Sequence, residues 1–573
     1  MSDDRDNESF PTGDDESPSY ELHHDLTHEE QTQHEGAGEL FGGSSPPPPR
    51  RIGRVTLALV LVILAGIGAG VGVLLTSVKA GKSLDQLIPA DAAVYVSVHA
   101  HPRGEQADAL DALKARLSPA QRTQVSSAID NALQSIVEDG LSGSFFASRA
   151  SLGRFAQPVP SLSWKSDFEP WLGDNVAVAV SAGASRPAIV LLADVKDEGK
   201  ARSTLDRVKE RVGASQFSYS ILDGVAYIST SDGYISSLRT RAQSNPISGD
   251  STFQRDRDRV QGSDSLVLAW VNSSQLGSAL SSLPGTGSIV AATLQDATLS
   301  VRVESQGIAL NATTKLPPGF QLGSGTPRLV ESAPANQVAA LTAFDLGDTI
   351  DDLMRLLSQT SGGRTQGSAL GTVQVIQQLI GIDLQRDLTP WLRGEFSVVF
   401  GGISAGGPEF GIVIDPTDKA AAGRTLTALR EHLPRLASQF GFPVRVTPGP
   451  LPNSFTIEIA GFPLLVTRGA DRVVISSSLP YARRLLHASE TTLGADALYR
   501  AAMGGSSQKV QSQLYVRLDK LRQLIEISMD PERVADYNKN VKPILQLFEA
   551  FGMRTTIDGD TSRTHALLTL ASK

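Results

Sequence analysis

The stretch DFEPWLGDNVAVAV, from Asp167 to Val180, is matched without gaps by DLTPWLRGEFSVVF, from Asp387 to Phe400. The two stretches share Asp, Pro, Trp and Leu at corresponding places, and each continues into a valine-containing apolar run. Tryptophan occurs only four times in the chain, so two Pro-Trp-Leu sequences in the same context indicate a duplication.

The segments on both sides of these stretches follow one another in the same order. Pro89-Ala90-Asp91 before the apolar run Ala93 to Val98 corresponds to Pro334-Ala335-Asn336 before Val338 to Phe344. Later correspondences are Ala188 to Asp194 with Phe410 to Asp415, Lys200 to Val212 with Lys419 to Leu433, Leu266 to Asn272 with Leu514 to Asp519, and Ala297 to Lys315 with Arg554 to Leu570. A period of roughly 245 residues predicts a duplicated domain, because solenoid repeats have only about 20 to 50 residues.

Within each copy, short apolar or alternating runs bounded by Gly, Asp and Ser predict strands. Examples are Val176 to Val180, Ala188 to Val195, Val225 to Thr230 and Leu266 to Val271. Neighbouring runs are only a few residues apart, which predicts hairpins and mostly antiparallel sheets. Ser118-Pro119-Ala120-Gln121 predicts a helix start with a capping box.

The predicted fold class is therefore α+β, with two similar lobes of mostly antiparallel sheets and covering helices. We expect the first lobe over residues 84–316 and the second, homologous lobe over residues 329–573. The stretch LPPGFQLGSGTPR, which starts at Leu316, predicts a Pro/Gly-rich linker over residues 317–328.

Charge is distributed unevenly along the chain. Residues 1–49 contain thirteen Asp or Glu and only one basic residue, Arg5, so that 48 acidic and 51 basic residues remain in the rest. Because nucleic-acid binding needs a clustered excess of Lys and Arg, the sequence predicts no nucleic-acid partner. The chain has no cysteine, which excludes disulfides, thiolate metal sites and cysteine nucleophiles.

The N-terminal part predicts a membrane anchor. Residues 1–49 are polar, acidic and end in a proline run, so we expect a disordered acidic cytoplasmic tail. Val55 to Val78 are 24 consecutive residues without a charge, long enough to cross a hydrocarbon core of about 30 Å. With the basic residues on both flanks, residues 50–82 predict a transmembrane signal anchor.

Three arginines precede the predicted helix and two lysines follow it, which orients the N-terminus to the cytoplasm and the body outside it. A cleaved signal peptide is the competing interpretation, with Val78 and Ala80 as the small residues of a cleavage site. The spacings Gly66/Gly70 and Gly68/Gly72 are typical of helices that dimerise in membranes, and they suggest a homodimer.

The order of these elements resembles a known bacterial family. An anchor helix, a P-A-D-A entry at Pro89 to Ala92 and a P-W-L-G element at Pro170 to Gly173 are similar to the domain of unknown function 3352 family. The resemblance covers roughly residues 84–573, although Asn336 and Arg393 depart from it in the second copy. It implies a membrane-anchored envelope protein, and it supplies no catalytic residues.

Motifs for catalysis or metal binding are nearly absent. Ser506-Ser507-Gln508-Lys509 has the S-x-x-K spacing of penicillin-binding enzymes, but no Lys-Thr-Gly accompanies it. His99 and His101 have metal-ligand spacing without a third ligand, and Phe344 and Leu346 occupy the matching places of the second copy. Arg255-Asp256-Arg257-Asp258-Arg259 indicates a self-neutralising solvated face. We predict no catalytic, cofactor-binding or metal-binding residue, and no cofactor; a loose metal site at the tail histidines His23, His24, His28 and His34 is a weaker hypothesis.

Three functions are consistent with these observations. The first is a non-enzymatic envelope protein that binds or scaffolds a ligand outside the plasma membrane, with its acidic tail available to a cytoplasmic protein partner. The second is a carrier or sensor of a lipid or other hydrophobic ligand, which requires a continuous pocket lined by Val, Ile, Leu and Phe. The third is a hydrolase whose site no motif reveals.

Overall fold

The computed structural model describes most of the body of the chain. The described residues are 83–99, 104–119, 121–123, 127, 163–181, 188–213, 217–281, 295–317, 319–320, 322–360, 381–439, 443–459, 461–487, 491–505 and 508–571. All of them belong to one compact unit, residues 54–573. The predicted tail, the predicted membrane segment and its glycine pairs lie outside these ranges. No helix within the described ranges is both long enough and apolar enough to cross a membrane.

The first half of the sheet, within residues 84–316, consists of eight strands. They are β1 (Ala92–His99), β2 (Leu172–Ser181), β3 (Ala188–Val195), β4 (Ser218–Leu222), β5 (Val225–Ser229), β6 (Val267–Val271), β7 (Ala297–Glu304) and β8 (Gly307–Lys315). Every neighbouring pair is antiparallel, in the order β4-β5-β3-β2-β1-β6-β7-β8.

The second half, within residues 329–573, consists of ten strands. They are β9 (Ala339–Phe344), β10 (Glu395–Ser404), β11 (Gly407–Ile414), β12 (Val444–Pro448), β13 (Ser454–Ile459), β14 (Phe462–Arg468), β15 (Val473–Ser476), β16 (Ser512–Arg517), β17 (Phe548–Asp558) and β18 (Thr561–Leu570). Their order is β12-β13-β14-β15-β11-β10-β9-β16-β17-β18, again with every pair antiparallel. The order of the first half thus recurs, with β12 and β13 added beyond β14.

The registers of the central strands recur as well. Val94 of β1 lies opposite Val180 on one side and Val271 on the other. Ala339 of β9 lies opposite Phe400 and Val516, the residues at the corresponding places of β10 and β16. A slip of one residue would have turned every side chain of a strand to the opposite face, so the matching registers place matching side chains on matching faces.

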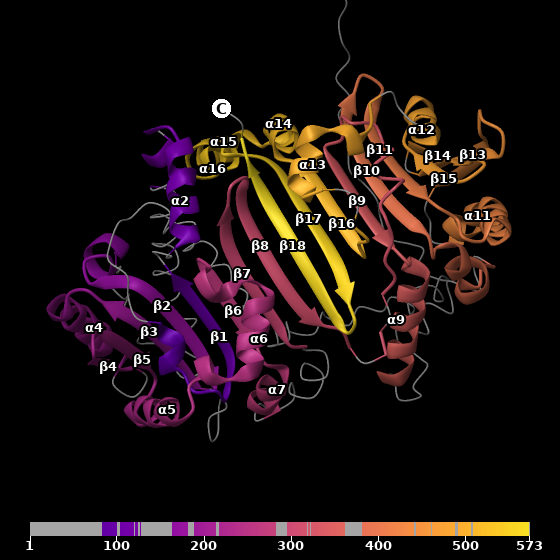
Figure 1. Ribbon diagram of the computed structural model, residues 1–573. Coiled ribbons are helices and arrows are strands. Elements are labelled where there is room, and N and C mark those ends of the chain that lie inside the picture. Colours follow the sequence, from indigo (N-terminus) through magenta and orange to yellow (C-terminus); the bar gives the residue numbers. More distant parts are fainter. Residues whose placement is uncertain are drawn as a thin grey trace, which may run out of the picture. The chain divides into compact units, whose positions relative to one another are not determined.

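Strands β8 and β18 join the two halves into one 18-stranded antiparallel sheet. Gly307 lies opposite Thr569 and Lys315 lies opposite Thr561, so the pairing is centred on Asn311 and His565. Figure 1 shows these two strands side by side, flanked by β7 and β17. The Nδ1 atom of His565 lies 2.8 Å from Oδ1 of Asn311, which links the two halves by a side-chain hydrogen bond.

The junction is expected to weaken in acid. Burial lowers the pKa of His565 below its ordinary value of about 6.5, opposed by Glu304 and assisted by Arg554. As the pH falls through about 6.5, His565 is therefore protonated in the unfolded chain before it is protonated in the folded protein. Protonation then favours the unfolded state, so the free energy of unfolding decreases below about pH 6.5. Urea unfolding at pH 7.5 and 5.5 should show a smaller acid loss for H565N, which keeps a hydrogen-bonding side chain, than for the parent. Equal losses in both proteins would show that His565 does not cause the loss of stability in acid.

Helices cover both faces of the first half. They are α2 (Glu105–Arg116), α4 (Glu198–Val212), α5 (Asp232–Ser244), α6 (Ser251–Arg259) and α7 (Ser273–Ser281). Successive strand residues point to opposite faces, so Tyr95 packs with α5 and α6 whereas Val94 packs with α7. Helix α4 packs its Ala201 and Leu205 near Trp171 in a third cluster.

Helices also flank the second half. They are α9 (Leu346–Thr360), α11 (Lys419–Gln439), α12 (Leu479–Leu486), α13 (Ala497–Met503), α14 (Leu518–Ser528), α15 (Pro531–Asp536) and α16 (Lys542–Leu545). Tyr481 of α12 and Tyr499 of α13 share one core cluster with Ala340 and Val399. Helices α9 and α11 contribute to a second cluster, around Trp391.

The α+β class with a mostly antiparallel sheet is confirmed. The predicted run Ala188 to Val195 is β3, and the run Ala297 to Lys315 is the hairpin of β7 and β8. The capping box is also confirmed, because Ser118 N donates to Oε1 of Gln121 and Gln121 N donates to Oγ of Ser118.

Candidate functional site

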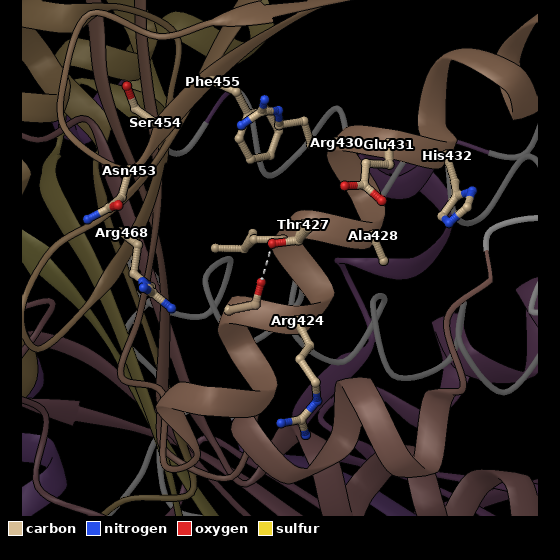
Figure 2. Close-up of a pocket in the computed structure, with 12 residues that line it drawn as sticks. Arg424, Thr427, Ala428, Arg430, Glu431, His432, Asn453, Ser454, Phe455 and Arg468 are labelled. Carbon is tan, nitrogen blue, oxygen red and sulfur yellow. Dashed lines mark hydrogen bonds between the residues drawn. The ribbon is translucent and has the colours of Figure 1, made fainter.

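A hollow of about 750 Å³ opens between helix α11 and the neighbouring strands β13 and β14. Figure 2 shows Asn453, Ser454 and Arg468 of the strands on one side of this space and the labelled residues of the helix on the other. Its lining residues are Gly423, Arg424, Leu426, Thr427, Ala428, Arg430, Glu431, His432, Asn453, Ser454, Phe455 and Arg468. We call it the α11 groove.

The sequence of α11 explains how the helix presents this wall. Asp418 caps the helix, since its Oδ1 atom accepts a hydrogen bond from Ala421 N at 2.8 Å. Leu426, Leu429 and Leu433, three and four residues apart, pack against the apolar residues of β12 to β14. Polar residues of the helix next to these leucines, including Arg424 and Thr427, are left exposed along the groove.

The opposite wall is formed where β13 begins and β14 ends. Ser454 is held by the preceding turn, because its Oγ accepts from Leu451 N at 2.9 Å and donates to Leu451 O at 2.6 Å. Asn453 has a positive φ of 54°, which Asn tolerates better than most residues. Arg468 N donates to Asn453 O at 3.3 Å, so these two lining residues are fixed to each other through the backbone.

Arg468 crosses the groove above a glycine of the helix. A Cβ atom on Gly423 would lie 2.4 Å from Nη1 of Arg468, closer than non-bonded atoms approach. The absence of a side chain at position 423 therefore provides the space in which the guanidinium lies. In Figure 2 the Arg468 side chain extends from the strand wall toward α11.

The groove has an excess of positive charge. Its lining contains Arg424, Arg430 and Arg468 against one carboxylate, that of Glu431. None of these three arginines has a carboxylate oxygen of the described residues within 4.0 Å, although arginines nearby, such as Arg472 and Arg484, are paired. Unpaired guanidinium groups that share a groove are suited to binding anionic groups, because each offers several N–H donors in a planar fork.

A second hollow has a volume of about 270 Å³. Arg468 lines both spaces, and the second is also lined by Lys419, whose Nζ donates to Ala470 O at 2.9 Å. The basic residues thus extend along the first part of α11 and are not gathered at a single point.

Catalytic chemistry has no evident basis in the groove. The Oγ1 atom of Thr427 donates to Gly423 O at 2.9 Å and Ser454 Oγ donates to the backbone, so neither hydroxyl is paired with a base in the described residues. No group of three or more His, Asp or Glu residues with metal-binding geometry occurs in the described part of the chain. The arrangement is suited to binding.

The residues that the sequence singled out do not form a site together. His99 Nδ1 lies 3.0 Å from Ser265 O at the end of β1, whereas His101 and the tail histidines lie outside the described residues. In the Arg255 to Arg259 segment of α6, Arg255 and Arg259 pair with Asp256, and Arg257 pairs with Asp258 and Asp85. Ser506 and Ser507 also lie outside the described ranges.

Sequence reasoning missed Arg424 and Arg468, because no motif connects a helix residue with the end of a distant strand. One available signal was Gly423 within an otherwise regular amphipathic helix. Another was the longer interval between helix and hairpin in the second copy than in the first.

The fold and the groove define an α+β protein with a duplicated strand order and a groove that has an excess of positive charge. The family model described as protein of unknown function (DUF3352) matches residues 240–570, and the chain belongs to this family. No curated protein and no solved structure matches the chain.

Proposed function

We propose that this chain is a single-pass envelope protein of the bacterial plasma membrane, with a duplicated extracytoplasmic domain that binds or scaffolds a ligand without catalysis. The N-terminal tail is cytoplasmic and available to a protein partner there. The anchor is supported by the 24 uncharged residues Val55 to Val78 and by the arginines before them. The Gly66/Gly70 and Gly68/Gly72 spacings support a dimer of anchor helices.

The duplication is supported by topology. Eight strands of each half follow one another in the same spatial order, and the registers around Val94 and Ala339 correspond. The pairing of β8 with β18 is reciprocal, since the first residue of each strand lies near the last residues of the other. Two copies that meet through the same strand are what a dimer of the ancestral unit would form before fusion.

The observation that carries the binding function is the α11 groove itself. It contains three arginines without ion pairs to described residues and no nucleophile paired with a base. Carriage of a hydrophobic ligand receives no comparable support, because the α11 groove is lined mainly by polar or charged side chains and neither hollow is lined by a continuous set of Val, Ile, Leu and Phe. We therefore favour recognition of a polar, anionic ligand.

Anchoring and orientation are tested by expressing the full chain in a bacterial host with an epitope after Ser2. We expect the protein in the membrane fraction, resistant to alkaline carbonate, because the uncharged segment spans the bilayer. Protease added outside spheroplasts should digest the body and leave the epitope intact. Mature protein that begins at Gly81, or loss of the epitope in intact spheroplasts, would contradict the proposal.

A further inference from the structure

We propose that the α11 groove binds an extended polyanion, a polymer with repeating phosphate or carboxylate groups, through Arg424 and Arg468 with Lys419 continuing the site. This inference rests on the proposed binding function and names the ligand class. It is carried by a comparison of the two copies at the place where they differ.

The registers identify the counterpart of Arg468 in the first half. Ser218 lies opposite Ser229 in the β4/β5 hairpin, and Leu465 lies opposite Ser476 in the β14/β15 hairpin. Each hairpin pairs with the next strand of its sheet at a corresponding position. Ser229 lies opposite Val190 of β3, and Ser476 lies opposite Gly411 of β11. Counting three residues onward from Ser218 and Leu465 pairs Ile221 with Arg468.

The helix caps identify the counterpart of Gly423. Asp197 accepts from Lys200 N at the start of α4, and Asp418 accepts from Ala421 N at the start of α11. Counting five residues onward from each cap pairs Arg202 with Gly423. The first copy therefore has an arginine on the helix and an isoleucine on the strand, where the second copy has a glycine and an arginine.

The environments of these pairs differ accordingly. Ile221 is buried in the cluster that includes Ala201 and Leu205 of α4, so in the first copy the strand packs directly on the helix. In the second copy the guanidinium of Arg468 occupies the space above Gly423 and the hollow opens beside it. Glycine in a helix interior lowers helix stability relative to alanine, so this exchange is unfavourable for folding alone. A requirement for the position of Arg468 explains it.

The distribution of charge indicates an extended ligand. Lys419 and Arg430 lie on the same face of one helix, because eleven residues are close to three full turns, and the rise of about 1.5 Å per residue separates them by roughly 17 Å. Arg424 lies between them along the helix axis and is turned by somewhat more than 100° around it. Arg468 lines both hollows and lies close to Gly423 of the same helix. The hydrogen bond from Arg386, at 2.8 Å, is the main reason that the pKa of Asp387 is lowered, and the charge of Arg424 contributes to a smaller extent. A small anion would occupy only one of these cations, whereas a polymer with repeating charges can contact several of them along the helix.

The test uses the full chain in nanodiscs of zwitterionic lipid, with fluorescence anisotropy of labelled linear polyphosphate and labelled polygalacturonate. We expect at least one polymer to bind, and the polymer that binds identifies the anionic group. The variant R424Q/R468Q should bind this polymer tenfold or more weakly than the parent protein. The logarithm of its binding constant should also fall less steeply with the logarithm of the salt concentration, with a slope smaller in magnitude by about two. Inorganic phosphate should compete only at far higher concentration than the polymer.

Two further variants separate the groove from general charge and from folding. R202Q/R259Q removes the same charge from the first half and should change the affinity less than twofold. G423A removes no charge and improves helix propensity, and the end of the Arg468 side chain must shift to accommodate its Cβ, so we expect undiminished thermal stability and a smaller loss of affinity than for R424Q/R468Q. The inference is overturned if neither polymer binds, if phosphate competes as well as polymer, or if R202Q/R259Q weakens binding as much as R424Q/R468Q. If the protein is anchored and oriented as proposed but gives one of these results, the polyanion is wrong as the ligand class, and the proposed anchoring and orientation are unaffected.

Discussion

Replacing Trp171 or Trp391 by alanine is expected to lower the free energy of unfolding by about 3 to 5 kcal/mol at either site. Both rings are nearly inaccessible, with exposed fractions of 2 % and 4 %. Each lies just before or next to the start of a long strand, β2 or β10, and packs against alanines of the helix that follows the next strand. Removing either ring leaves a cavity between sheet and helix that the surrounding backbone cannot close.

The phenylalanine variants should distinguish the two sites. Nε1 of Trp171 donates to Asp167 O at 2.6 Å. In the second half the corresponding carbonyl, Asp387 O, accepts from Thr425 Oγ1 at 2.5 Å, and Nε1 of Trp391 is buried without a partner among the described residues. W171F loses a hydrogen bond and W391F loses none, so W171F should cost about 1 kcal/mol more.

Urea unfolding followed by circular dichroism measures these differences. Hydrogen exchange read by mass spectrometry locates them, and each alanine variant should lose protection first in the half that contains the substitution. A loss below about 1 kcal/mol for W171A or W391A would contradict the packing argument.

Replacing Glu395 by glutamine is the second change with a large expected effect, a loss of about 3 kcal/mol or more. Glu395 begins β10 and its exposed fraction is 4 %. Its carboxylate accepts three consecutive backbone N–H groups, from Arg328 at 2.7 Å, Leu329 at 2.8 Å and Val330 at 3.1 Å. Glutamine has nearly the same shape, but its amide group donates where an acceptor is needed and leaves buried donors unsatisfied.

The effect should be visible locally as well as in global stability. Arg328 ends the Pro/Gly-rich stretch 317–328, and Leu329 and Val330 follow it directly. E395Q should therefore release the segment around residues 328–330 and expose it to limited proteolysis. E458Q is the matched control, since Glu458 lies at the partly exposed surface of β13 with Arg445 at 3.9 Å and should cost less than about 0.5 kcal/mol. If E395Q is as stable and as protease-resistant as E458Q, the carboxylate of Glu395 does not hold the backbone of residues 328–330 in place.

Local patterns in the sequence were sufficient for several of the strands and for one helix start. Alternating runs such as Ala188 to Val195 predicted β3 with its bounds, because side-chain periodicity is a local property of the chain. The cap at Ser118 was predictable for the same reason, since its hydrogen bonds join residues three apart. The hairpins also followed, because short intervals between strands leave only an antiparallel connection.

The sequence by itself determined that the chain is α+β, that the Asp-Pro-Trp-Leu stretch occurs twice, and that one uncharged segment is long enough for a membrane span. Only the tertiary structure decided that β8 pairs with β18 around Asn311 and His565, because pairing of edge strands depends on contacts between residues more than two hundred positions apart. It alone also placed Arg468 over Gly423, since a helix position and a strand end in separate segments have no common period or motif that would reveal their approach.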